Sequence, residues 1–140
     1  MYPLVTLLKW IDFQSLGDQR GGLVALELGV GKPVPFEIKR VYYIHRTEPG
    51  VSRGFHAHRN LKQVAICVAG KCRIVLDDGN RREEAWLDSP LRGLLIENLT
   101  WRELHDFSPD CVVLVLASEH YDEADYIRSY PDFLKQAHSG

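Results

Sequence analysis

Short apolar segments alternate with turn residues along most of this chain. The segments are rich in β-branched and aromatic side chains, which favour extended strands over helices. Their spacing is typical of an all-β sandwich or barrel. The sequence therefore predicts strands over residues 23–30, 36–45, 64–69, 72–76, 84–87, 94–97 and 112–117.

Turn residues support this prediction between the strands. The run Asp77-Asp78-Gly79-Asn80 contains residue types that tolerate the positive φ angles of a hairpin turn, and Gly70 separates two further strands. Only the end of the chain changes character, because residues 122–130 and 133–137 have a helical pattern, with Pro131 dividing them. The predicted fold is thus all-β with a short C-terminal helical segment.

Composition limits the classes of protein and ligand that this chain can represent. Its 140 residues suit a single domain covering residues 1–140, and 45% hydrophobic with 26% charged residues is typical of a globular protein. The net charge of -2 provides no general attraction for nucleic acid or an anionic membrane. No apolar run approaches the roughly 20 residues of a membrane span. An anionic ligand must therefore be held by a local cluster of arginines.

The cysteines indicate the compartment rather than the function. Cys67, Cys72 and Cys111 are odd in number, and two of them lie inside apolar runs. Buried free thiols are expected here, and they suit the reducing cytoplasm. The N-terminus also lacks the basic and apolar regions of a secretory signal. We expect a cytoplasmic protein.

The segment Arg53-Gly54-Phe55-His56-Ala57-His58-Arg59 carries the densest functional signal. Side chains two residues apart on a strand share a face, so His56 and His58 are expected to point together, with Phe55 and Ala57 in the opposite layer. A lone histidine is usually a satisfied core or surface residue. Two adjacent imidazoles instead favour acid-base chemistry, because their ordinary pKa values lie near neutral pH and each proton bound discourages the next.

The residues around this pair have the spacing of a known motif. Gly50, His56, His58, Gln63 and Gly70 are spaced as in the first motif of the cupin superfamily. This resemblance implies a double-stranded β-helix, or jelly roll, with the site inside the barrel. Metal-binding cupins have a glutamate ligand where this chain has Gln63, and an amide is a poor ligand for a divalent transition metal.

The second cupin motif also departs from the metal-binding pattern. Leu104 stands where the family's ligand histidine lies, and His105 comes one residue late, which on a strand turns it to the other face. A loop or bulge could restore its direction. The sequence nevertheless favours a histidine pair that acts without a metal ion.

Arginines and aromatic residues supply candidate ligand contacts. Arg40 and Tyr42 share one strand face, although the alternation does not settle whether that face or the one with Tyr43 is core. Guanidinium groups bind phosphate oxygens bidentately, and the alternative is that they are solvated strand edges. Trp101 could stack on a base or sugar. The candidate binding residues are Arg20, Arg40, Tyr42, Arg53, Trp101 and Arg102.

Longer segments resemble a particular group of cupins. Residues 20–27, 36–44, 53–58, 76–79, 87–90, 105–108 and 116–128 resemble, in this order, the dTDP-4-oxo-6-deoxyglucose 3,4-ketoisomerases, which are WxcM-like cupins. The segments run over almost the entire chain. The 3,5-epimerases of the dTDP-rhamnose pathway are more remotely similar and also have an Arg-Gly-x-His segment.

The resemblance implies an isomerase of a nucleotide-linked sugar. Such enzymes convert a dTDP-4-keto-6-deoxy sugar to its 3-keto isomer through an enediol, and an aminotransferase then makes a 3-amino sugar. The resemblance further implies that neither a metal nor an organic cofactor is used. It also implies a homodimer with exchanged N-terminal strands.

The resemblance also implies roles for individual residues. His56 corresponds to the base that takes the C3 proton, and His58 to the group that moves protons between the two oxygens. Arg40 and Tyr42 line the sugar pocket and polarise the enediolate, and Arg53 holds phosphate or sugar oxygens. Arg20 and Arg102 would approach one face of the sugar, where they could influence the C4 configuration of the product.

Two other interpretations remain open from the sequence. One is a metal-dependent cupin enzyme, against which Gln63 and the displaced His105 argue. The other is a non-catalytic cupin that binds a nucleotide sugar, against which the intact pair of His56 and His58 argues.

Overall fold

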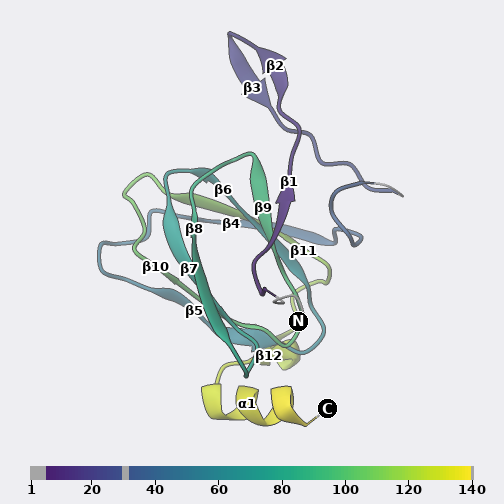
Figure 1. Cartoon of the computed structure of the whole chain (residues 1–140), viewed down its shortest axis with the longest axis vertical. Helices are drawn as coiled ribbons and strands as arrows, with labels where there is room; N and C mark the ends of the chain where they lie inside the picture. The colour runs from purple at the N-terminus through teal and green to yellow at the C-terminus, as the bar shows by residue number, and fades with distance from the viewer. Residues whose placement is uncertain (1–5, 30–31, 140) are drawn as a thin grey trace, which may run out of the picture.

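Two five-stranded antiparallel sheets form the body of the molecule (Figure 1). The computed structural model describes residues 6–29 and 32–139. The first sheet contains, in spatial order, β1 (Lys9–Asp12), β9 (Arg92–Ile96), β6 (Gln63–Ala69), β11 (Val112–Ala117) and β4 (Arg40–His45). The second contains β12 (Tyr126–Ile127), β5 (Arg53–His58), β10 (Trp101–His105), β7 (Cys72–Asp77) and β8 (Arg82–Leu87). These sheets confirm the predicted all-β class.

The main core lies between the two sheets. Alternate side chains on β7 and β11, such as Ile74 and Val113, point into this space and are completely buried. Cys67, Cys72 and Cys111 belong to the same cluster and are free thiols, as the apolar runs around them predicted.

A second apolar cluster covers the outer face of the first sheet. Val64 and Ile66 on β6 pack there against Phe13 and Val34, with partly buried side chains from residues 24–38 around them. Strand β6 is therefore buried on both faces, which explains its continuous apolar sequence. The strand expected over residues 23–30 does not form over residues 24–29; Leu23 is the last residue of β3, and Val30 lies outside the described residues. The apolar side chains Val24 and Leu26 cover the sheet face in an irregular conformation.

The hairpin between β7 and β8 confirms the turn prediction. Gly79 has φ 94°, and the carboxylates of Asp77 and Asp78 accept hydrogen bonds from the backbone N–H groups of Gly79 and Asn80. Local side-chain acceptors of this kind stabilise turns.

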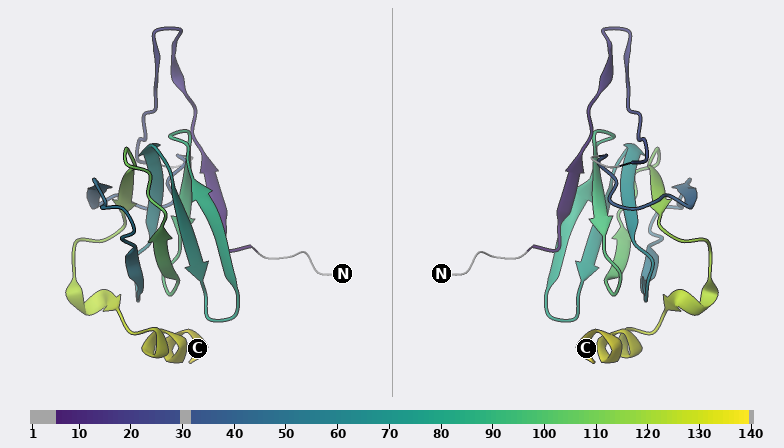
Figure 2. Two further views of the ribbon diagram at one scale, coloured as in Figure 1. Left: turned by 90° about the vertical axis from the view of Figure 1, so that its left-hand side faces the viewer. Right: turned by 90° about the vertical axis from the view of Figure 1, so that its right-hand side faces the viewer.

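A third, two-stranded sheet projects from the body. It consists of β2 (Leu16–Asp18) and β3 (Gly21–Leu23), and we call residues 16–23 the N-terminal arm. Every residue of this arm is exposed, and Figure 2 shows that it extends away from the end of the body that carries the C-terminal helix. Strand β1, which precedes the arm, pairs with β9 of the same chain.

The C-terminal segment differs from its prediction. Residues 122–130 form a short 3-10 helix (Glu123–Asp125) and then β12, which adds an edge strand to β5, so the helix expected there is wrong. Pro131 does not divide two helices. It lies in the first turn of α1 (Tyr130–His138), where its missing N–H costs no hydrogen bond. None of the helices in the described ranges is long and apolar enough to cross a membrane.

Helix α1 covers the outer face of the second sheet. Its completely buried Phe133 packs with Ala57, Trp101 and Ile127. Tyr130 donates a hydrogen bond of 2.6 Å to Asp77 Oδ2. The helix thereby stabilises the back of the strand that carries the histidine pair.

Candidate active site

A cavity of about 630 Å³ lies between the two sheets. Its polar wall contains side chains from four strands and from the segment after β11. The polar residues that line it include Arg40, Tyr42, Arg53, His56, Gln63, Arg102, Tyr126 and Arg128. The cavity therefore brings together the histidine strand and most of the binding residues expected from the sequence.

The two histidines project to the same side of β5. Their ring centroids are 4.9 Å apart and their planes are nearly perpendicular. His56 lines the cavity, whereas His58 lies deeper and is only 1% exposed. Ala57 is buried in the opposite layer as expected, but Phe55 has φ 57° and is exposed, because the strand is irregular next to Gly54.

Gly54 permits the close approach of β5 to β10. Its φ is 91°, and a Cβ at this position would lie 3.0 Å from the Arg102 carbonyl oxygen. A larger residue would be strained in φ and would push the strands apart. The glycine thus helps to set the position of His56 relative to Arg102.

Hydrogen bonds define which nitrogen of each imidazole carries the proton. His56 Nδ1 lies 3.0 Å from the Gly54 carbonyl oxygen, which can only accept, so Nδ1 is the donor. His58 Nδ1 lies 3.2 Å from Asp125 Oδ2, a carboxylate acceptor. His58 Nε2 is buried without a hydrogen-bond partner in the described structure. In the neutral rings, both Nε2 atoms therefore retain a free lone pair.

Both imidazoles are held in the neutral form. Burial lowers the pKa of His56 to about 4, and the nearby Arg102 charge acts in the same direction. Burial, followed by the charges of Arg102 and His56, lowers the pKa of His58 to about 2. At neutral pH the pair can accept a proton, which is the state that a general base needs.

Arg102 contributes a positive charge inside the barrel. Its side chain is 2% exposed, and it donates hydrogen bonds to Gln63 Oε1 and, over 3.1 Å, to the Thr100 carbonyl oxygen. Both acceptors are neutral. Burial lowers the pKa of Arg102 to about 10, so the guanidinium is still charged at neutral pH. An anion that forms in the cavity would be stabilised by this charge.

The inner face of β4 supplies Arg40 and Tyr42. Sequence alternation left the direction of this face open, and the structure places Tyr42 in the cavity wall while Val41 and Tyr43 are exposed. Gln63 Nε2 donates a hydrogen bond of 2.9 Å to Tyr42 Oη. The Arg40 guanidinium lies 5.3 Å from the centre of the Tyr42 ring, and its buried Nε has no hydrogen-bond partner in the described structure.

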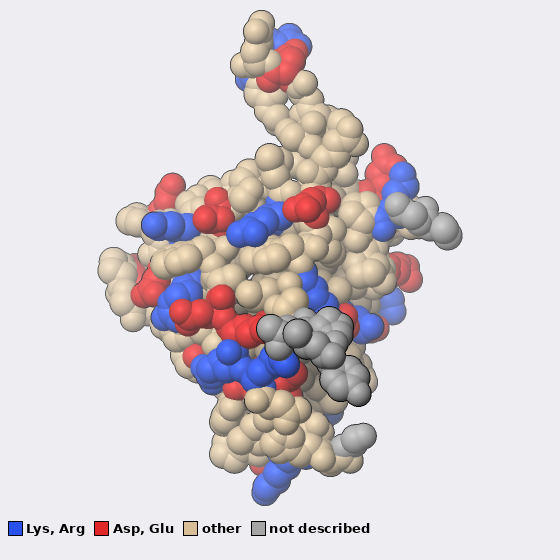
Figure 3. All heavy atoms as spheres, in the orientation of Figure 1, with Lys and Arg blue, Asp and Glu red and all other residues tan. Residues whose placement is uncertain are grey.

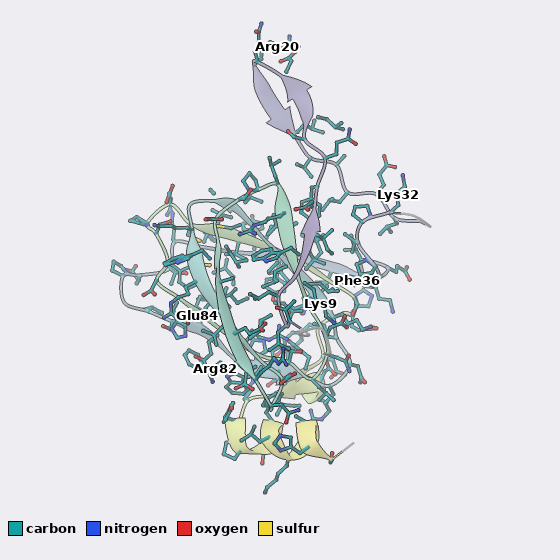
Figure 4. The ribbon with its side chains drawn as sticks, in the orientation of Figure 1. Lys9, Arg20, Lys32, Phe36, Arg82 and Glu84 are labelled. Carbon is teal, nitrogen blue, oxygen red and sulfur yellow. The ribbon has the colours of Figure 1, made fainter. Side chains whose placement is uncertain are left out.

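Two of the expected binding residues lie elsewhere in this chain. Trp101 does not reach the cavity, because alternation on β10 turns it outward, where it is buried against Tyr130 and Phe133. Its role as a stacking platform is therefore corrected to a packing role. Arg20 lies at the tip of the N-terminal arm (Figure 4), where its ion-pair partner is Asp18.

Sequence reasoning missed the contribution of the C-terminal segment. The Tyr126 ring lies 5.0 Å from the His56 ring and 4.4 Å from the His58 ring. Arg128 stacks over Tyr126 at 4.2 Å and forms a two-point ion pair with Glu123. Periodicity gave no signal for these positions, since the segment was expected to be helical.

His105 does not join the histidine pair. Its Nδ1 lies 2.7 Å from Ser52 Oγ and its Nε2 lies 3.0 Å from Glu103 Oε1. Residue parity on β10 explains this position, because Arg102 and Leu104 point into the cavity. Within residues 6–29 and 32–139, no group of three or more His, Cys, Asp or Glu side chains is arranged to hold a metal ion.

Acidic and basic side chains are mixed over the surface of the barrel. Figure 3 shows them interspersed on the face that it presents, without a large area of one sign. This distribution agrees with the net charge of -2. Positive charge is instead concentrated at the cavity, in the arginines named above.

Comparison with known proteins identifies close relatives. The family model "FdtA: WxcM-like, C-terminal" matches residues 6–138. TDP-4-oxo-6-deoxy-alpha-D-glucose-3,4-oxoisomerase of Aneurinibacillus thermoaerophilus is 54% identical over 127 residues, which cover 91% of this chain and 90% of that protein.

Solved structures agree with this result. QdtA, a sugar 3,4-ketoisomerase from Thermoanaerobacterium thermosaccharolyticum in complex with TDP, has a TM-score of 0.91 and 40% identity, and covers 97% of this chain and 98% of its own. A histidine-to-asparagine mutant of QdtA is in complex with TDP-4-keto-6-deoxyglucose. The WlaRB TDP-quinovose 3,4-ketoisomerase of Campylobacter jejuni has a TM-score of 0.87 and 48% identity, over 94% of this chain and 99% of its own.

These similarities cover nearly the whole chain, including the strands of both sheets. They confirm the predicted jelly-roll fold and the predicted reaction class, the 3,4-isomerisation of a keto sugar. The chain belongs to the WxcM-like family, which includes the sugar 3,4-ketoisomerases.

Proposed function

We propose that this protein converts TDP-4-keto-6-deoxyglucose to a TDP-linked 3-keto-6-deoxyhexose, which serves 3-amino sugar synthesis. The observation that supports this most strongly is the pair of neutral imidazoles beside a buried guanidinium, with His56 and Arg102 lining the cavity and His58 directly behind His56. A base and a fixed positive charge are the two groups that an enediolate mechanism requires.

The reaction is redox-neutral within the sugar. A proton leaves C3, the remaining electron pair forms the C3–C4 double bond, and the C4 oxygen gains the negative charge and then a proton. Loss of the O3 proton re-forms a carbonyl at C3 while C4 accepts a proton. In our proposal His56 Nε2 takes the C3 proton, because its Nδ1 is bound to Gly54 and its pKa is lowered.

Proton movement between the two sugar oxygens is assigned to His58. Asp125 accepts from its Nδ1, so the unpartnered Nε2 is the atom that can carry a proton. Arg102 stabilises the enediolate from inside the barrel, and Arg40 and Tyr42 polarise the oxygen on C4 from β4. The site therefore provides a counter-charge, and none of the described residues that line the cavity is an aspartate or a glutamate.

Arg53 is proposed to bind the diphosphate of the substrate. Arg53 lines the cavity but is exposed, at the start of the histidine strand. Its guanidinium can hold phosphate oxygens while the sugar lies next to His56. We further propose a cytoplasmic location, which the free thiols of Cys67, Cys72 and Cys111 support.

We also propose that the protein is a homodimer and that the N-terminal arm reaches the partner subunit. The arm exposes Leu16 and Leu23 to solvent, and Val41 and Tyr43 are exposed on β4, an edge strand of the first sheet. Exposed apolar groups of this kind are often covered by a partner. We propose that the exchanged N-terminal segment includes this arm, which directly follows β1.

NMR spectroscopy in deuterated buffer tests the proposed reaction. Incubation of TDP-4-keto-6-deoxyglucose with the protein is expected to give a 3-keto product with deuterium at C4. A parallel incubation in ordinary water keeps a proton at C4, and its coupling constant to H5 identifies the C4 configuration. An unchanged spectrum, with TDP binding retained, would instead indicate a nucleotide-sugar-binding protein.

Light scattering of the purified protein tests the dimer. We expect twice the mass of the chain, and the double variant Leu16→Asp/Leu23→Asp is expected to be monomeric. Trp86→Asp is the matched control, because Trp86 is similarly exposed but lies on β8 of the other sheet. A monomeric wild-type protein would rule out the proposed exchange.

A further inference from the structure

We propose that Gln63 is a positioning residue that turns the hydroxyl proton of Tyr42 toward the sugar. Gln63 lies on β6, opposite the histidine strand, and is 2% exposed. The inference rests on the proposed ketoisomerase function and gives a role to the residue that stands where metal-binding cupins have a carboxylate.

The orientation of the Gln63 amide follows from its two neighbours. Arg102 can only donate hydrogen bonds, so the amide atom that contacts its guanidinium must be the carbonyl oxygen Oε1. The NH₂ group is then directed at Tyr42 Oη, 2.9 Å away. The direction of the amide is therefore determined by chemistry.

This orientation determines what the tyrosine can do. Tyr42 Oη accepts a hydrogen bond from Gln63, so its own O–H cannot be directed at the amide nitrogen. Tyr42 lines the cavity, and its hydroxyl is left to donate to a ligand there. A hydroxyl aimed at the C4 oxygen of the sugar stabilises the charge that develops on it.

The surroundings keep this arrangement in one state. Burial raises the pKa of Tyr42, so its hydroxyl carries its proton at neutral pH. The buried guanidinium of Arg102 is also bound to the Thr100 carbonyl oxygen, which restrains it from turning away from Gln63. The two hydrogen bonds of the guanidinium and the one between Gln63 and Tyr42 thereby hold these side chains in a defined orientation.

A glutamate at this position would reverse the direction of the hydrogen bond. In Gln63→Glu, the carboxylate would form an ion pair with Arg102 and accept from Tyr42, which would draw the hydroxyl proton away from the sugar. In Gln63→Met, the side chain keeps a similar volume but gives Tyr42 no hydrogen bond. Gln63→Met therefore tests the loss of the hydrogen bond that orients the Tyr42 hydroxyl, and Gln63→Glu tests the reversal of that hydrogen bond.

Steady-state kinetics and TDP binding of the full-length variants test the inference. Gln63→Met is expected to lower kcat about tenfold, and Gln63→Glu to lower it further, toward the roughly 100-fold loss expected for Tyr42→Phe. The dissociation constant for TDP is expected to stay within about twofold in each case, because the nucleotide does not contact Gln63 in our proposal. Gln136→Met, on α1 and outside the cavity, is the matched control and is expected to keep the wild-type kcat.

A double-mutant cycle distinguishes positioning from a purely structural role. If Gln63 acts through Tyr42, Gln63→Met is expected to change kcat less than about twofold in a Tyr42→Phe background. An equal tenfold loss in both backgrounds would overturn the inference, as would wild-type kcat in Gln63→Glu. The Gln63→Glu variant keeps the inference testable even if Gln63→Met fails to fold, because a kcat equal to that of the wild-type protein would still overturn it.

Failure of the inference is distinguishable from failure of the proposed function. If the wild-type protein converts the substrate and the Gln63 variants have the same kcat, only the role of Gln63 is overturned. Absence of wild-type turnover in the deuterated buffer would overturn the ketoisomerase function and, with it, this inference.

Discussion

The interior of the barrel and the N-terminal arm are organised in opposite ways. In the interior, His58, Gln63 and Arg102 are almost fully buried and hydrogen-bonded to residues that are distant in sequence. In the arm, every residue is exposed, and the ion pair of Arg20 joins it to Asp18, two positions away. The cavity residues are thus held in place by contacts within one chain, whereas the residues of the arm are exposed in it.

Electrostatics sharpen this difference. The charge of Arg102 is buried, so it lowers the pKa values of both histidines through a medium that screens it little. The charges of the arm are in water, where an ion pair contributes little to stability. Substitutions in the two regions should therefore differ in the property that they affect.

Replacement of the proposed base is expected to have the largest effect. His56→Asn should lower kcat by about 100- to 10,000-fold, because it removes general base catalysis, while TDP binding is retained. Turnover and TDP titration measure the two properties. His120→Asn, at an exposed position outside the main cavity, is the control. Full activity of His56→Asn would contradict the assigned role.

Substitutions in the core are expected to lower the free energy of unfolding much more than substitutions in the arm. Ile74→Ala should lower the free energy of unfolding by about 2–5 kcal/mol, because Ile74 is completely buried between the sheets and truncation leaves a cavity. Gln19→Ala, in the exposed turn of the arm, should change it by less than about 0.5 kcal/mol. Urea denaturation measures both. Similar losses in the two variants would show that the arm is part of the cooperative core.

Arg20→Ala is expected to lower kcat/KM about tenfold without changing thermal stability. The resemblance implies that Arg20 approaches the sugar, and in the proposed dimer the arm that carries Arg20 reaches the partner subunit. Mixing Arg20→Ala with His56→Asn subunits sharpens this expectation. A mixed dimer would contain one cavity with His56 in its own chain and Arg20 from its partner. Activity above the sum of the separate variants is therefore expected, and a simple sum would show that Arg20 serves no neighbouring cavity.

The pH dependence is expected to be the smallest effect. A neutral imidazole is the active base, and the pKa of His56 is lowered to about 4, so protonation should inactivate the free enzyme only as pH approaches that value. The expected kcat/KM is level from pH 8 to about 5. A histidine with the ordinary pKa of 6.5 would instead lose activity below neutrality. A decline in kcat/KM centred near that value would contradict the desolvated base.

Local sequence signals predicted the barrel well where side chains alternate or form apolar runs. The strand over Val112–Ala117 is the clearest case, and parity also predicted that Arg40 and Tyr42 share one face, although only the structure shows that this face points inward. Prediction failed over residues 24–29, because Val24 and Leu26 pack on the outer sheet face without strand pairing. It failed over residues 122–130 because pairing with β5 outweighed a local helical pattern.

The candidate site shows the same division. The spacing of His56 and His58 is a local property, so the pair could be identified without a structure. The contributions of Asp125, Tyr126 and Arg128 depend on how the chain returns to β5, which no local pattern records. Trp101 was misplaced for a related reason, since helix α1 buries the face of β10 that it occupies.

By itself, the sequence determined the class of fold, the histidine pair and the reaction class, because alternation, spacing and family motifs are all written along the chain. Only the tertiary structure decided the protonation of the site side chains, their positions and the direction of their hydrogen bonds. Burial made the imidazoles neutral, placed a charged guanidinium beside them and directed the amide of Gln63 at Tyr42. Desolvation and hydrogen-bond direction depend on contacts between distant strands, and these exist only once the two sheets have packed.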